Sequence, residues 1–124
     1  MIIKDVVLYK TNKCNKNGFY IPHDVIKESI LNTEHKIFGT ISDDARETTD
    51  LTEISHECIN LTVDDDKNEI RCDTKILDTP KGKILKDNID TLVPNAVSVC
   101  DLGTGKDSKV IKTHKLIAVN YVNK

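Results

Sequence analysis

Residues Ile54–Leu77 read ISHECINLTVDDDKNEIRCDTKIL, and the rest of the predicted sheet is built around them. Apolar and polar side chains alternate on both sides of the segment DDDKN, which is the pattern of a strand with one buried face. The polar residues of DDDKN are typical of a turn. The stretch therefore predicts an antiparallel hairpin of two strands.

On the N-terminal side of this hairpin, the sequence predicts two more strands and a helix. Ile2–Tyr9 is apolar and β-branched, and a loop rich in Asn follows it. Pro22–Leu31 has apolar residues at helical spacing and acidic residues near its start, which predicts a short amphipathic helix. Lys36–Ile41 is a candidate strand, and the acidic, hydroxyl-rich segment Ser42–Thr52 predicts an exposed loop.

On the C-terminal side, the sequence predicts a helix followed by two strands. A helix is expected to start at Asp78–Pro80 and to run to Leu92, with Pro94 just after its end. The segment AVSVCDLG then predicts a strand, TGKDS a turn, and the alternating residues Ile111–Tyr121 a final strand.

Length and composition fit one folded domain over residues 1–124. Six strands and two helices predict an α+β fold, a small and mostly antiparallel β-barrel flanked by two short helices. The formal charge is −2, both signs are interspersed and aromatic residues make up 4%. This pattern indicates neither a nucleic-acid nor a membrane partner.

Cofactor motifs are absent from the sequence. The four cysteines, Cys14, Cys58, Cys72 and Cys100, are widely spaced and lack zinc-site spacing, so we expect reduced thiols and no metal. The segment GTGKDS lacks the phosphate-loop pattern, and Asp64–Asp66 lacks the ligands and the glycine of a calcium loop. We therefore expect no cofactor.

Two histidines and one serine lie in segments predicted to be strands. His56 and His114 are each more often structural than catalytic in such a setting. Ser98 lies between two valines and could act as a nucleophile if a histidine reached it. Individually, these residues are weak evidence for any function. The order of short sequence segments along the chain is more informative.

Six segments follow one another in the chain: NKNGFYIPHDVIKESI, FGTISDD, ISHECINL, KILDTPKGKILKDNI, PNAVSVCDLG and KLIAVNYV. In this order, and over nearly the entire chain, they resemble the prohead core (head maturation) protease family of tailed bacteriophages. Ser55-His56, Thr79–Gly82 and Val97–Gly103 fall at matching places. The resemblance implies a small β-barrel flanked by helices, shared with herpesvirus assemblins, and it places the nucleophilic serine at Ser98.

The sequence departs from this family at the positions that carry catalysis. Asp43 stands where the family has its catalytic histidine, and a carboxylate of ordinary pKa is a poor base for a serine hydroxyl. Val99-Cys100-Asp101 stands where the family has Ser-Arg-Gly, which removes a positive charge and adds a carboxylate beside the expected oxyanion. The triad that the resemblance implies is therefore expected to be broken.

The preferred hypothesis is a catalytically inactive prohead-protease-like domain, retained as a structural or auxiliary protein of a phage head. It would bind capsid or scaffold proteins, associate with itself and need no cofactor, in the virion or the host cytoplasm.

The alternative is an active serine endopeptidase of phage head maturation that cleaves scaffold and capsid proteins. Ser98 would be its nucleophile and His56 or His114 its base, with the other histidine or Asp43 orienting that base. A third possibility is that Cys100 is the nucleophile, because a thiolate needs less help from a base.

Overall fold

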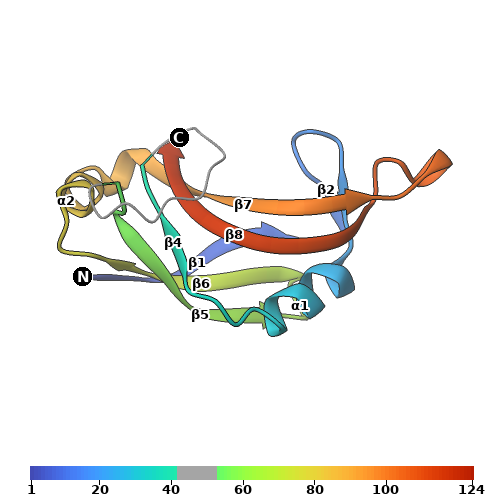
Figure 1. The fold of residues 1–124 in the computed structure, drawn as a ribbon, viewed down its shortest axis with the longest axis horizontal. Coiled ribbons are helices and arrows are strands. Elements are labelled where there is room, and N and C mark those ends of the chain that lie inside the picture. The colour runs from blue at the N-terminus through green and yellow to red at the C-terminus, as the bar shows by residue number, and fades with distance from the viewer. Residues whose placement is uncertain (42–52) are drawn as a thin grey trace.

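The computed structural model describes residues 1–41 and 53–124. These residues form an α+β structure in which a curved two-stranded ribbon lies over a four-stranded sheet (Figure 1). The loop expected over 42–52, and Asp43 within it, lie outside the described residues. Neither α-helix in the described part of the chain has the length and apolar character needed to cross a bilayer.

The elements follow the order expected from the sequence. Their bounds are β1 (Ile2–Lys10), β2 (Lys13–Cys14), β3 (Tyr20–Ile21), α1 (His23–Leu31), β4 (Ile37–Gly39), β5 (His56–Asp64), β6 (Glu69–Ile76), α2 (Pro80–Asp87), the short 3-10 helix η1 (Ile89–Thr91), β7 (Leu92–Leu102), the short 3-10 helix η2 (Gly105–Asp107) and β8 (Ile111–Asn123). The small β2–β3 pair lies between the first predicted strand and the predicted helix, where the sequence predicts a loop.

The second helix is shorter than expected, and the strand after it is longer. The Thr79 hydroxyl accepts the Gly82 amide at 3.0 Å and caps α2, as the sequence predicts. The helix ends at Asp87, and β7 begins at Leu92 and runs through Pro94. A proline is tolerated in β7 because the strand has only β8 as a paired neighbour, so one of its edges needs no amide donor.

The described strands divide into three sheets with the orders β1-β6-β5-β4, β7-β8 and β2-β3, and the ladders within them are antiparallel. The β5–β6 ladder confirms the predicted hairpin. The sheets do not close into the single barrel that the resemblance implies. They are joined along β4 and β8, but β1 and β7 lie against each other without strand pairing in the described residues.

A single carboxylate on β6 fixes irregularities in both neighbouring strands. Asp5 in β1 and Asn60 in β5 have positive φ angles of 59° and 54°, and each lies at a break in its ladder. The Asp73 carboxylate accepts the Asn60 side-chain amide and the Asp5 backbone amide, both at 2.9 Å. These hydrogen bonds, the one from Asn60 first, lower the pKa of Asp73. Asp73 therefore holds three strands in register.

The ribbon and the four-stranded sheet meet where β4 passes β8. The Thr40 carbonyl accepts the Tyr121 amide at 2.9 Å. A β-carbon at residue 39 would collide with the Val119 carbonyl and with Nε2 of His56, so only glycine permits this approach. The Tyr121 hydroxyl also meets the Thr74 hydroxyl of β6 at 2.8 Å across the interior.

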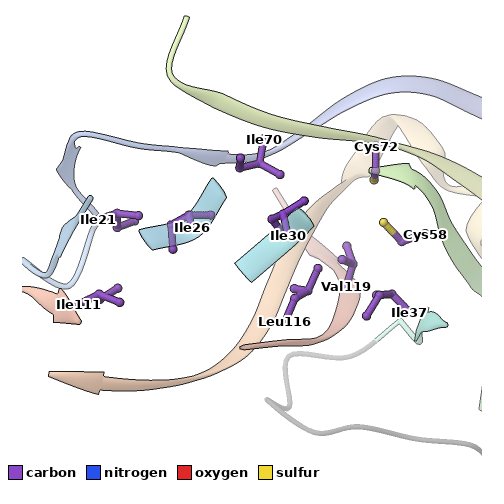
Figure 2. Packing of buried hydrophobic residues seen from close by; sticks show 10 residues of the cluster. All are labelled: Ile21, Ile26, Ile30, Ile37, Cys58, Ile70, Cys72, Ile111, Leu116 and Val119. Carbon is purple, nitrogen blue, oxygen red and sulfur yellow. The ribbon is translucent and has the colours of Figure 1, made fainter. Parts of the chain in front are cut away.

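The main core lies between the two layers and includes the buried face of α1 (Figure 2). Its buried members are Ile21, Ile26, Ile30, Ile37, Cys58, Ile70, Cys72, Ile111, Leu116 and Val119. Ile26 is fully buried and Ile30 nearly so, whereas Leu31 at the end of the same helix is 68% exposed. The core therefore fixes the position and rotation of α1.

Shortening Ile26 should destabilise the whole domain, because its side chain is fully buried between the helix and the sheets. We expect Ile26→Ala to lower the free energy of unfolding by about 2–5 kcal/mol. Urea unfolding followed by circular dichroism measures this loss. Leu31→Ala is the matched control in the same helix and should change the stability little; equal losses in both variants would contradict the assigned packing.

Candidate functional site

Ser98 lies in the middle of β7 beside a second possible nucleophile. Its Oγ is 3.4 Å from Sγ of Cys100, two residues further along the same face. Cys100 is the cross-strand partner of His114 in β8, and such partners share a face of the ladder. The structure thus brings Ser98, Cys100 and His114 to one face of the ribbon.

Both ring nitrogens of His114 are engaged by residues other than Ser98. Nε2 is 2.8 Å from the Tyr9 hydroxyl of β1, and Nδ1 is 2.7 Å from the Ser29 hydroxyl of α1. The Tyr9 and His114 rings also meet edge to face, with centroids 5.2 Å apart. Burial lowers the pKa of His114 to about 4, so the ring is neutral at pH 7.

The partner of Nε2 of His114 is the Tyr9 hydroxyl. Burial raises the pKa of Tyr9 above its ordinary value, so its hydroxyl keeps its proton at pH 7. The hydroxyls of Tyr9 and Ser29 are thus joined through the His114 ring, each by one hydrogen bond. The Oγ of Ser98 is instead 3.4 Å from Sγ of Cys100.

His56 forms a separate, fully buried group. Its Nε2 donates to the Val119 carbonyl, because a carbonyl can only accept. Nδ1 is therefore the acceptor, and the Ser55 hydroxyl, 2.6 Å away, donates a hydrogen bond to it. The ring packs edge to face against Tyr121 at 4.9 Å between centroids, and burial lowers the pKa of His56 to about 4.

The described structure therefore gathers Ser98, Cys100 and His114 and places His56 in contact with other residues. Sequence reasoning missed Tyr9 and Ser29. They lie 105 and 85 positions from His114 along the chain, and no local pattern links them to it. Among the described residues, no group of three or more His, Cys, Asp or Glu side chains is arranged to hold a metal ion.

Acid should destabilise the domain in part through His56. The unfolded chain takes up a proton near pH 6.5, whereas the buried ring resists protonation down to about pH 4. The stabilisation is complete above pH 6.5 and is lost as the pH falls from 6.5 toward 4, by on the order of 3 kcal/mol.

His56→Gln keeps hydrogen-bonding groups but cannot titrate, so its unfolding free energy should fall less between neutral pH and about pH 5. Urea unfolding at both pH values measures the difference. The same fall in His56→Gln as in the wild type would rule out this role of His56.

Comparison with known proteins supports the fold. No protein-family profile and no curated protein matches the sequence. Among solved structures, the chain is similar to the capsid assembly protease gp21 of bacteriophage T4, with a TM-score of 0.71 and 12% sequence identity. The match covers 97% of this chain and 80% of that chain. The protein therefore has a phage prohead-protease-like fold.

Proposed function

We propose that this chain is a catalytically inactive prohead-protease-like domain that serves as a structural or auxiliary protein of a phage head. The likeness of its fold to a capsid assembly protease supports a role in a phage head. The observation that carries the proposal is the contact of Tyr9 with Nε2 of His114, because it occupies the nitrogen that a Ser98 nucleophile would need.

A serine nucleophile requires a base within hydrogen-bond reach of its hydroxyl, about 2.6–3.2 Å away. His114 gives its two nitrogens to Tyr9 and Ser29, and His56 gives its two to Ser55 and the Val119 carbonyl. The Oγ of Ser98 instead lies 3.4 Å from Sγ of Cys100. The Tyr9 hydroxyl, whose pKa is raised, keeps its proton at pH 7 and cannot act as a base.

The segment after Ser98 is also poorly suited to stabilise an oxyanion. The Asp101 amide donates to the Thr113 hydroxyl at 3.1 Å, and the Asp101 carboxylate accepts from the same hydroxyl at 3.0 Å. A backbone amide that could have faced an oxyanion is therefore already used, and a negative charge lies nearby. This arrangement stabilises the ribbon instead.

In this proposal the domain acts by binding capsid or scaffold proteins and by associating with itself, in the virion or the host cytoplasm. One edge of β7 is not paired with any described strand, and its Val99 and Leu102 side chains are 63% and 43% exposed. Exposed apolar side chains on an open edge favour contact with another protein.

The second candidate function is the active serine endopeptidase with Ser98 as nucleophile. It is favoured by the gathering of Ser98, Cys100 and His114 on one face of the ribbon. In this alternative, the Tyr9 side chain moves aside when substrate binds and His114 becomes the base. Cys100 would be the nucleophile in a thiol version of the same site.

Chemical labelling separates the two functions. We expect the purified, folded chain neither to react with a fluorophosphonate nor to cleave an unstructured scaffold-like polypeptide, because no histidine of the described structure is hydrogen-bonded to Ser98. Gel fluorescence and mass spectrometry give the readout, with Ser98→Ala and the exposed Ser108→Ala as a matched pair. Labelling and cleavage that vanish in Ser98→Ala and persist in Ser108→Ala would establish the peptidase.

Binding to phage heads tests the other half of the proposal. We expect the wild-type chain to sediment with proheads of the phage that encodes it, and to remain in the supernatant when the proheads are omitted. A folded chain that does not sediment with proheads would contradict a head-associated role, whatever the outcome of the labelling.

A further inference from the structure

A groove between α1 and β8 has no role in the site described above, although both share Ser29 and His114. Its volume is about 440 Å³. One wall is formed by Glu28 and Ser29 of α1 and by Asn32, which directly follows the helix. The opposite wall is the N-terminal half of β8, from Lys112 to Lys115. The groove is therefore bounded by a helix on one side and by a strand on the other.

The β8 wall of the groove is an open strand edge. One edge of β8 pairs with β7, and the C-terminal half of the other edge is covered where Tyr121 bonds to Thr40 of the segment after β4. Further toward the N-terminus, His35 donates from Nε2 to the Leu116 carbonyl at 2.9 Å. Just before β8 begins, Tyr20 of β3 forms an isolated parallel bridge with Val110. Between these two points, over Lys112–Lys115, no described strand other than β7 pairs with β8, and α1 runs beside it (Figure 1).

The edge presents backbone groups as well as side chains. The Leu116 carbonyl faces away from β7, since it accepts from His35. The ladder is regular from Thr113 to Leu116, and backbone groups of alternate residues point the same way in an antiparallel ladder. The amide and carbonyl of His114 therefore also face away from β7, where an added strand could bond to them.

The charge of the groove selects the kind of strand that would bind. Lys112 and Lys115 are exposed on the β8 wall, and Glu28 is the single acidic residue among the described residues that line the groove. Lys112 is 4.0 Å from the Asp107 carboxylate, a weak pair at the surface. Lys115 has no ion pair in the described part of the chain. The described lining therefore carries more positive than negative charge.

We propose that the groove binds an extended, acidic segment of a partner protein, which adds to the open edge of β8 as a further strand. Backbone bonds to β8 would supply affinity, and Lys112 and Lys115 would select acidic side chains. This inference rests on the proposed function as a binding domain of the phage head, and it names the contact surface and the chemistry of the partner.

The test uses a fluorescein-labelled peptide of about ten residues in which Asp and Glu alternate with Val and Thr, the pattern of an added strand. Fluorescence anisotropy should show saturable binding to the wild-type chain. Lys112→Glu with Lys115→Glu should weaken it at least about tenfold. The matched double variant Lys75→Glu with Lys86→Glu, at exposed sites on β6 and α2, should bind nearly as the wild type does.

A second probe separates strand addition from charge attraction. The same peptide with alternate backbone amides methylated keeps its charges but loses donors, and we expect its affinity to fall at least about tenfold. Equal affinity of the two peptides, no saturable binding, or equal losses in both double variants would each overturn the proposal.

Sedimentation with proheads then distinguishes the groove from the function on which it rests. Loss of sedimentation in Lys112→Glu with Lys115→Glu, but not in the control double variant, supports the groove as the contact surface. If that variant still sediments as the wild type does, the groove proposal fails and the head-associated role stands. If the wild type binds the peptide but never sediments with proheads, the proposed function fails and the groove stands.

Discussion

The ribbon and the four-stranded sheet are held together where the backbone of β4 passes β8 with no side chain between them. Gly39 makes this approach possible, because any β-carbon there would meet the Val119 carbonyl and His56. His56 completes the same junction by donating to that carbonyl and packing against Tyr121. A histidine that could have served catalysis is thus part of the contact that joins the two layers, and its neutral, buried ring suits that role.

His114, at the other end of the ribbon, is likewise held by structural contacts. Burial of Ile26 and Ile30 fixes α1, which places Ser29 against one ring nitrogen, while β1 places Tyr9 against the other. The resulting chain of hydrogen bonds satisfies polar groups that the packing has taken from water. In the proposed function, a protease-like fold thus keeps a serine and a histidine on one face without a base for the serine. The proposal assigns the function to the surface, which includes the unpaired edge of β7 and the groove beside β8.

Local patterns predicted the elements, and distant contacts determined the site. Alternation along Ile54–Leu77 was sufficient for the β5–β6 hairpin, because a two-residue period is local, and the Thr79-Pro80 start of α2 is also a local signal. The early start of β7 was missed because Pro94 suggests a break, and only the three-dimensional structure shows that it lies on an unpaired edge. The Val119 partner of His56 and both partners of His114 come from segments far away in the chain, so the sequence leaves open whether each histidine is structural or catalytic.

The most direct test of this account is a nitrogen-15 spectrum of the histidine side chains, which reports the protonation and hydrogen bonding of each ring nitrogen. Because Nε2 of His114 bonds to Tyr9, Tyr9→Phe will shift the Nε2 resonance of His114 strongly, and Ser98→Ala will shift it much less, since Ser98 Oγ contacts Cys100. A larger shift in Ser98→Ala than in Tyr9→Phe would show that Ser98 contacts the ring directly. That result would mean that His114 can serve as the base of Ser98, which contradicts the proposed inactivity.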